Sequence, residues 1–351
     1  MLVAITALSF SVAKAGDLAV TGSVKASYTM QGSDSAAQGV NVGKALGLSN
    51  EFTLSASGEL DNGMTWSYAQ DIDGATVQDD AKLTLTTGMG TVGVFISEGG
   101  LDVDNAASQS VVSRPSDTSF AEGMVDSWDI SGMNTLQYHT PADMLPFGIT
   151  AKVAYAPQMV TGANNSYEAA GAANDGSFTA AATSGVVTQT YDMGRSATHY
   201  QVKAAPIDGL VVGADYLEYS GVDGATAQEP ESGSYYATYA IGPATIGASK
   251  NFLATAMATN ATDHIESIEG TKYSIAFNVN DNLSVSYENE ESNPDNKTAA
   301  TENYTMESSG IQAAYTMGGM TLAIAMNEHE NATYVQNKDV SDTVLSVAMA
   351  F

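Results

Sequence analysis

The chain ends with Val344-Leu345-Ser346-Val347-Ala348-Met349-Ala350-Phe351, a stretch in which large apolar and small residues alternate. In an extended strand, alternate residues point to opposite faces, so one face carries the large apolar side chains and the other carries serine and alanine. A free chain end is usually frayed and polar unless something holds it. One apolar face suits a strand between lipid and a barrel interior, and it also suits an edge of a soluble β-sandwich. The rest of the chain has to decide between them.

The first residues are typical of an export signal. An apolar stretch that includes Leu2, Ile5 and Leu8 precedes Ala13-Lys14-Ala15, which has the small-residue pattern of a cleavage site. The stretch is too short for a spanning helix, which needs about 20 apolar residues. We expect a signal peptide at 1–15 and one domain at 16–351. The usual basic start is missing, which is consistent with a truncated beginning.

Composition excludes several classes of protein. There is no cysteine, so neither disulfides nor thiolate metal sites are expected. Asp and Glu number 40 against 12 Lys and Arg, for a net charge of −28, so nucleic acid is not an expected partner. With 44% hydrophobic residues and 17 tyrosines, the chain is not a disordered acidic tail either. An exported chain without a long apolar helix is periplasmic, secreted or a membrane barrel.

Turn signals interrupt the alternation at unequal intervals. Short breaks built from residues that favour turns lie at 61–63, 87–90, 141–147, 206–209, 241–243, 280–282 and 317–319. Long polar breaks lie at 31–45, 73–78, 98–133, 158–196, 221–232, 253–268, 293–305 and 330–339. Short and long breaks alternate throughout. This pattern predicts an all-β protein: a transmembrane antiparallel β-barrel of about sixteen strands, with short periplasmic turns and long extracellular loops.

The strands themselves support a barrel in lipid. Residues Tyr273, Ile275 and Phe277 share one face of a strand, and Lys272, Ser274 and Ala276 share the other. Aromatic residues gather near predicted strand ends, as expected at the two lipid–water boundaries: Tyr28, Tyr68, Tyr155, Tyr216, Phe252, Tyr287, Tyr315 and Phe351. The high strand propensity of tyrosine is the simpler explanation of this enrichment. We favour the boundary interpretation because the tyrosines prefer the apolar face.

The terminal strand, the hairpin Glu59-Leu60-Asp61-Asn62-Gly63-Met64-Thr65-Trp66 and the alternation of short turns with long loops resemble the general porins of Gram-negative outer membranes, most closely the alphaproteobacterial type. The resemblance covers the whole mature chain. It implies a homotrimer of sixteen-stranded barrels in outer-membrane lipid. It also implies that the third extracellular loop, residues 98–133, folds into each pore as a constriction.

The third loop is acidic and contains a single base. Its charged residues are Glu98, Asp102, Asp104, Arg114, Asp117, Glu122, Asp126 and Asp129. A loop of this length without obvious structure is usually functional or disordered. Acids occur throughout this chain, so any one of them has a plain compositional explanation. As a segment, the loop is predicted to constrict the pore.

Rare basic residues are the more informative charges. Five lysines fall on the polar face of their strands and are predicted to line the pore wall: Lys25, Lys82, Lys152, Lys203 and Lys272. At mid-bilayer a lysine facing lipid would cost about 2–4 kcal/mol. Lysines opposite an acidic loop would set an electric field across the pore, and charged walls select ions. The alternative is that each lysine pairs locally with a strand acid. Lys250 falls on the apolar face, which requires a bulge, a rim position or a subunit contact.

Other chemistry has little support in the sequence. The four histidines have no metal-ligand spacing, no Ser-His-Asp set stands out, and no cofactor or metal site is predicted. Acid-rich segments at 221–232 and 288–302 are compatible with loop-bound Ca²⁺, although neither has the spacing of a known calcium loop.

We therefore expect a channel without catalysis that passes small hydrophilic solutes and ions, with a mild preference for cations. A surface barrel whose long loops bind a partner, a substrate-specific channel and, less favoured, an outer-membrane enzyme remain the alternatives.

Overall fold

The computed structural model describes residues 18–33, 43–74, 76–117, 124–142, 144–157, 179–184, 187–192, 196–220, 226–255, 257–258, 265–296 and 304–351. The expected signal peptide and Glu122 lie outside these residues. Among the described residues, no helix has the length and apolar character needed to cross a membrane.

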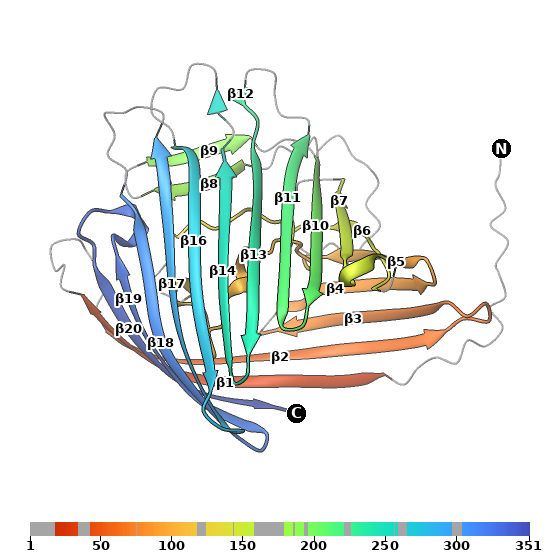
Figure 1. The fold of residues 1–351 in the computed structure, drawn as a ribbon, viewed down its shortest axis with the longest axis horizontal. Helices are drawn as coiled ribbons and strands as arrows, with labels where there is room; N and C mark the ends of the chain where they lie inside the picture. Colours follow the sequence, from red (N-terminus) through yellow and green to blue (C-terminus); the bar gives the residue numbers. More distant parts are fainter. Residues whose placement is uncertain are drawn as a thin grey trace.

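Sixteen antiparallel strands close into one barrel (Figure 1). They are β1 (Ala19–Ser33), β2 (Lys44–Glu59), β3 (Thr65–Asp73), β4 (Thr76–Thr87), β5 (Gly90–Ile96), β6 (Thr135–His139), β7 (Thr150–Ala156), β10 (Ser196–Ile207), β11 (Leu210–Ser220), β13 (Glu231–Ile241), β14 (Ala244–Ala254), β16 (Ile265–Asn278), β17 (Leu283–Asn296), β18 (Met306–Met317), β19 (Met320–Glu330) and β20 (Val340–Ala350). The expected strand number and all-β class are confirmed.

The last strand closes the barrel on the first. β20 pairs antiparallel with β1, from Ala350 opposite Ser23 to Val340 opposite Ser33. Two backbone hydrogen bonds of 2.9 Å join Phe351 to Gly22, and the Phe351 ring packs edge-on against Phe52. The alternating stretch at the chain end is therefore tied down on both edges, because β20 also pairs with β19.

The two faces of the barrel are inverted relative to a soluble protein. On β16, Tyr273 and Ile275 are 57% and 44% exposed, whereas their neighbours Lys272 and Ser274 are 1% and 7% exposed. On β20, Leu345 and Met349 are likewise exposed. Apolar side chains therefore cover the outside and polar side chains point inward, as the alternation predicts.

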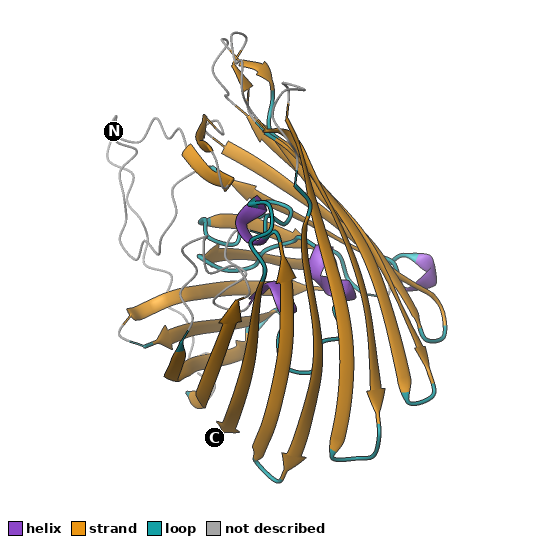
Figure 2. Cartoon of the chain, turned by 90° about the vertical axis from the view of Figure 1, so that its left-hand side faces the viewer, coloured by secondary structure: helices purple, strands orange, loops and turns teal. Residues whose placement is uncertain are grey.

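Short turns gather at one rim and long connections at the other (Figure 2). Small two-stranded sheets occur within the long connections: β8 (Thr179–Ser184) pairs with β9 (Val187–Asp192), and β12 (Thr226–Gln228) pairs with β15 (Met257–Ala258). A short 3-10 helix, η3 (Pro146–Gly148), forms part of the turn before β7.

Some of the expected long breaks are wrong in their bounds, the break at 253–268 among them, because β16 begins at Ile265. The break at 73–78 is short, because Asp73 pairs with Thr76 and Gly74 takes a positive φ of 54° between them. The break at 293–305 begins too early, because β17 continues to Asn296. At its end β17 carries polar residues, Asn293 and Asp295, on its outward phase as well, so this part of the strand resembles a loop in the sequence.

The third loop enters the barrel. It connects β5 to β6 and contains the 3-10 helices η1 (Asp104–Ala107) and η2 (Pro115–Asp117). Helix η1 contacts β13, β14 and β16, and η2 contacts β17 and β18. The residues that receive the loop belong to the inward phase of these strands, so the loop lies against one wall of the interior.

Candidate functional site

Hydrogen bonds from the wall hold the first half of the third loop. The Val103 N–H donates to Asp215 Oδ1 at 2.9 Å, and the Ser249 hydroxyl donates to the Asp104 carbonyl at 2.6 Å. The Ser274 hydroxyl donates to the carbonyl of Ala107 at 2.6 Å. Polar inward side chains thus satisfy the loop backbone, which explains how an irregular segment can be buried.

One glycine makes this approach possible. A Cβ atom on Gly247 would lie 1.9 Å from the carbonyl oxygen of Ala107. No side chain fits between β14 and helix η1 at this point, so the loop rests directly on the strand backbone.

The next part of the loop crosses β17 and β18. The N–H groups of Val111 and Val112 donate to Ser286 Oγ at 3.0 Å and to Gln312 Oε1 at 2.9 Å. The Ser116 N–H donates to Glu290 Oε1 at 2.9 Å. Attachment therefore continues strand by strand as far as η2.

Two cations and three carboxylates form a buried cluster, which we call the clamp: Asp104, Arg114, Asp126, Lys272 and Glu290. Arg114 lies 3.0 Å from Asp126 and 3.2 Å from Glu290. Lys272 Nζ lies 2.8 Å from Asp126 Oδ1 and 3.1 Å from Asp104 Oδ2. The clamp joins both arms of the loop to strands β16 and β17.

Charge pairing decides the ionisation of Asp126 and Arg114 in the clamp. Burial alone would raise the pKa of Asp126, but Lys272 and Arg114 outweigh burial and lower that pKa below its usual value. Burial would also lower the pKa of Arg114, but the carboxylates of Asp126, Glu290 and Asp117 outweigh it and raise that pKa. Asp126 and Arg114 are therefore charged at neutral pH. Removing one partner of such a buried set leaves an uncompensated charge, which costs about 3–5 kcal/mol.

A second polar cluster fixes the beginning and end of the loop. The fully buried His199 on β10 lies 3.1 Å from Asp129 and 3.0 Å from Asp215. Burial raises the pKa of Asp102 to about 10, helped by hydrogen bonding to the side chains of Asp104 and Asp129. Burial acts upward on the pKa of Asp129 as well, but hydrogen bonds from His199 and Asp102 lower it overall. A protonated Asp102 can thus donate a hydrogen bond within the loop.

The predicted pore-wall lysines separate into two groups. Lys272 points inward but is covered by the loop, and Lys82 forms an ion pair of 3.0 Å with Glu98 where the loop leaves β5. Lys272 therefore lies on the inward face predicted for it, and the loop packs directly on it. Lys25, Lys152 and Lys203 are half-buried on the inward phase, and within the described part of the chain none forms an ion pair.

The predicted loop acids also differ in their surroundings. Asp104 and Asp126 belong to the clamp, and Asp102 and Asp129 belong to the second polar cluster, around His199. Asp117 pairs with Arg114 at 2.7 Å, and its side chain is 48% exposed. Among the described acids of the loop, Asp117 therefore has a carboxylate that is still exposed to the barrel interior.

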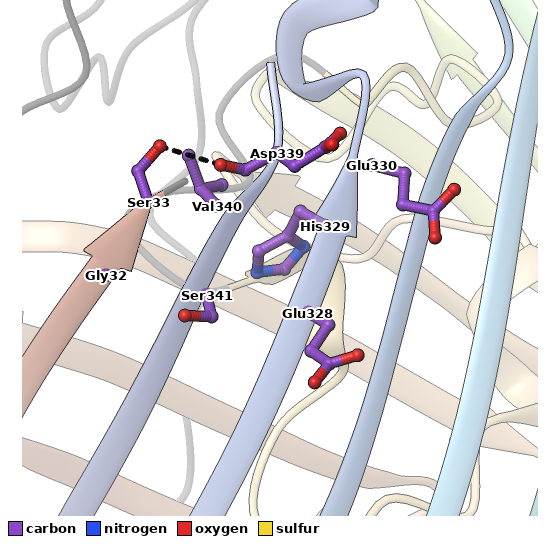
Figure 3. A pocket seen from close by; sticks show the side chains of 8 residues that line it. All are labelled: Gly32, Ser33, Glu328, His329, Glu330, Asp339, Val340 and Ser341. Carbon is purple, nitrogen blue, oxygen red and sulfur yellow. Dashed lines mark hydrogen bonds between the residues drawn. The ribbon is translucent and has the colours of Figure 1, made fainter. Parts of the chain in front are cut away.

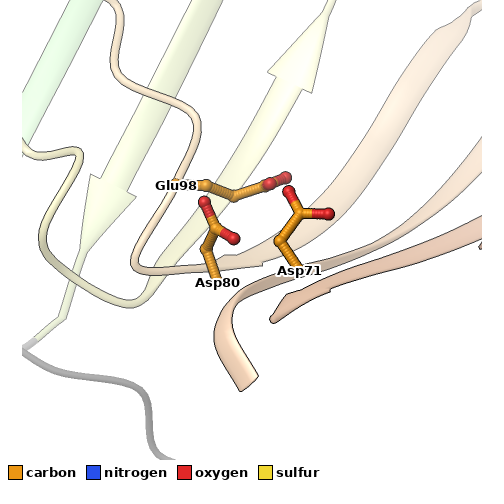
Figure 4. A group of neighbouring side chains, drawn as sticks. All are labelled: Asp71, Asp80 and Glu98. Atoms are coloured by element: carbon orange, nitrogen blue, oxygen red, sulfur yellow. The ribbon is translucent and has the colours of Figure 1, made fainter. Parts of the chain in front are cut away.

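Three carboxylates form a separate acidic group near the third loop. Asp71, Asp80 and Glu98 converge at the start of the third loop (Figure 4), with one oxygen of each within 4.8 Å of the others. Lys82 gives this group a positive partner through Glu98.

Lys250 points outward and pairs with Glu269 at 2.7 Å. The pairing of β14 with β16 runs through Lys250 without a shift in register, which excludes a bulge there.

Several site residues are missing from the sequence interpretation. The sequence places Glu288 and Glu290 in an acid-rich loop at 288–302, but they lie on β17, fully buried against the third loop. The Ser110 hydroxyl donates to Glu288 Oε2 at 2.6 Å. The alternation of acids with Tyr287 and Asn289 was the available signal for a strand here.

A pocket of about 320 Å³ marks the seam where the barrel closes (Figure 3). Its lining comes from the ends of β1, β19 and β20, and includes Glu328, Glu330 and Asp339. The Ser33 hydroxyl donates to the Asp339 carbonyl at 2.7 Å across this seam. The pocket lies at the rim of the long connections, apart from the third loop.

Solved structures share this architecture. The chain is similar to the anion-selective porin from Comamonas acidovorans, with a TM-score of 0.65 and 12% identity over 96% of this chain and 100% of that one. It is similar to Salmonella typhi OmpF in a complex with daunomycin, with a TM-score of 0.61 and 11% identity over 96% and 98%. A mutant of the Rh. blastica porin gives a TM-score of 0.53 and 12% identity over 95% and 100%.

No family model and no curated protein matches the sequence. The alphaproteobacterial subtype stays a prediction. What the structural likeness establishes is architectural: the chain has the closed sixteen-stranded fold of the general porins.

Proposed function

We propose that this protein is an outer-membrane porin through which small hydrophilic solutes and ions diffuse without energy coupling. The observation that carries the proposal is the combination of an inverted barrel with a third loop clamped against one interior wall. A clamped loop narrows the interior and leaves the remainder of it open.

The uncovered wall supports passage rather than plugging. Hydrogen bonds join the described part of the third loop to the strands from β10 to β18 that face it, namely β10, β11, β13, β14, β16, β17 and β18. The inner faces of β1 and β2 instead carry exposed polar residues, among them Ser23, Ser49 and Glu51. Sixteen strands enclose enough space for an aqueous channel beside the loop. The solute path therefore runs between the loop and the first strands.

The outer surface supports a position in lipid. Tyr155, Tyr216, Tyr287, Tyr315 and Phe351 are all more than a third exposed on the outside. The Tyr216 hydroxyl donates to Glu231 Oε2 at 2.7 Å, so the apolar ring of this tyrosine is exposed on the outside while its polar hydroxyl is hydrogen-bonded. Such rings suit the boundary between hydrocarbon and water. Assembly as a homotrimer, with long loops outside the cell, belongs to the same proposal.

Ion preference follows from the charges left open. The net charge of −28 and the exposed Asp117 favour cations, whereas Lys25, Lys152 and Lys203 oppose them. We propose a mild cation preference, because charged pore walls select ions of the opposite sign.

Liposome swelling tests the diffusion proposal. Liposomes that contain the purified protein should swell in isotonic solutions of small sugars and swell more slowly as the sugar becomes larger. Swelling with one sugar alone would favour a substrate-specific channel. Absence of swelling with every sugar, for protein shown to be folded in the liposomes, would contradict the proposal.

A further inference from the structure

The last long connection, residues 331–339 between β19 and β20, also folds inward. It contains the 3-10 helix η4 (Ala332–Tyr334). Tyr334 is 4% exposed, and it packs with Ala332, Met306 and Val340 in an apolar cluster that Met124 and Val125 of the third loop join. The first and last halves of the chain therefore meet inside the barrel.

The backbone of this connection is strained. Asn331, Thr333, Tyr334 and Asn337 all have positive φ values, between 49° and 58°. A positive φ is unusual for a tyrosine, and such conformations persist only where surrounding contacts enforce them. The Ala332 N–H donates to the Lys338 carbonyl at 2.8 Å, which closes the connection on itself.

The Tyr334 hydroxyl lies at the junction with the third loop. It accepts the Val125 N–H at 2.7 Å and lies 2.7 Å from Ser292 Oγ. Ser292 Oγ in turn donates to the Val125 carbonyl at 3.1 Å. Because each hydroxyl carries one proton, Tyr334 must donate to Ser292 when Ser292 donates to Val125. The three residues thus form a closed ring of hydrogen bonds.

Two consecutive residues of the third loop are therefore fixed. The ring holds both backbone polar groups of Val125, and the clamp holds the side chain of Asp126. Burial raises the pKa of Tyr334 to about 12, so its hydroxyl keeps the proton that the ring requires at neutral pH. We name residues 124–130, which lead back from the clamp toward β6, the return arm.

We propose that Tyr334 is a positioning residue of the channel, which holds the return arm against the wall and so sets the width of the solute path. The inference rests on the proposed porin function. It makes the last connection a second part of the constriction, supplied from the opposite end of the chain.

A thiol placed on the return arm tests this inference directly. The chain has no cysteine, so Met124→Cys provides a single thiol whose labelling by a water-soluble maleimide reports exposure of the arm. We expect Tyr334→Phe to speed labelling about tenfold, which corresponds to about 1.4 kcal/mol. This is the order expected when a partly buried N–H loses its acceptor.

Matched variants and a second readout separate positioning from general damage. Tyr287→Phe removes an outward hydroxyl from the same strand as Ser292 and should leave labelling unchanged. Tyr334→Phe should also increase current noise in planar bilayers while the thermal unfolding of the barrel in detergent stays close to that of the parent.

Labelling and current noise equal to the parent in both Tyr334→Phe and Tyr334→Ala would overturn the inference. If the parent protein carried no current, the porin proposal would fail, whereas labelling would still decide whether Tyr334 positions the arm.

Discussion

Lys272 on β16 lies 2.8 Å from Asp126 in the return arm, and 146 positions separate the two in the chain. The lysine is 1% exposed, so this residue of the pore wall lies beneath the third loop. Arg114 binds the same aspartate from the loop side. The ion pair of Lys272 with Asp126 thus attaches the third loop to the barrel wall.

Replacing Lys272 should release the loop. In Lys272→Met, Asp104, Asp126 and Glu290 lose a buried cation, and a loss of about 3–5 kcal/mol in loop docking is expected. Single-channel recordings should show larger and noisier currents. Lys250→Met is the matched control, because its partner Glu269 is on the outer face and both side chains are over 40% exposed. Equal currents in the Lys272→Met variant and the parent would contradict the role of the clamp.

Removing the uncovered lysines should change selectivity without loosening the loop. Lys152 and Lys203 lie on neighbouring strands, with Lys152 opposite Gln201 and Lys203 opposite Thr150. Without these charges, cations meet less repulsion along the path. The double variant Lys152→Gln, Lys203→Gln should shift the reversal potential in a KCl gradient further toward that of a cation channel. A shift of the same size in Lys250→Gln would show that the effect is not from the lumen.

Alkaline pH should loosen the loop through Asp102. Its pKa is raised to about 10 in the folded protein from the ordinary aspartate value of 3.8, so the folded state binds the extra proton between these values. Its contribution to stability is fully present below the unfolded pKa, falls as pH rises and is lost above about 10. The lowered pKa values of Asp126 and Asp129 act oppositely, because their contributions are lost as pH falls below the usual aspartate range.

The matching measurement is the labelling rate of Met124→Cys, corrected for maleimide reactivity, between pH 7 and pH 10. Loop exposure should rise across this range in the parent. Asp102→Asn, which keeps a hydrogen-bond donor at every pH, should flatten the rise. An unchanged slope in Asp102→Asn would assign the pH response to another group.

Gly247 should tolerate no side chain. A Cβ atom in Gly247→Ala would overlap the Ala107 carbonyl, so helix η1 must move away from β14. Overpacking of this kind costs about 1–3 kcal/mol. Thermal unfolding should occur at lower temperature and current noise should rise. Gly88→Ala is the control, because an added Cβ there meets nothing within 4 Å.

The barrel could be predicted from the sequence because strand alternation is a local property. The phase of Leu345 and Met349 on β20, or of Tyr273 and Ile275 on β16, needs only the sequence around it. The turns follow from glycine, proline and asparagine for the same reason. Closure of β20 on β1 follows once the strand number is even.

The contents of the interior could not be predicted in the same way. A polar inward residue has the same local pattern whether water or another segment covers it, so Lys272 looks like Lys152. Glu290 looks like a loop acid for a related reason, since both inner walls and loops are polar. Contacts such as Tyr334 with Val125 join segments 209 positions apart, and no local pattern encodes them.

Single-channel recording in planar bilayers tests the central claim most directly. The account predicts stepwise currents from the purified protein and, in a KCl gradient, a reversal potential that moderately favours K⁺. Folded protein that inserts into the bilayer and carries no current would contradict it.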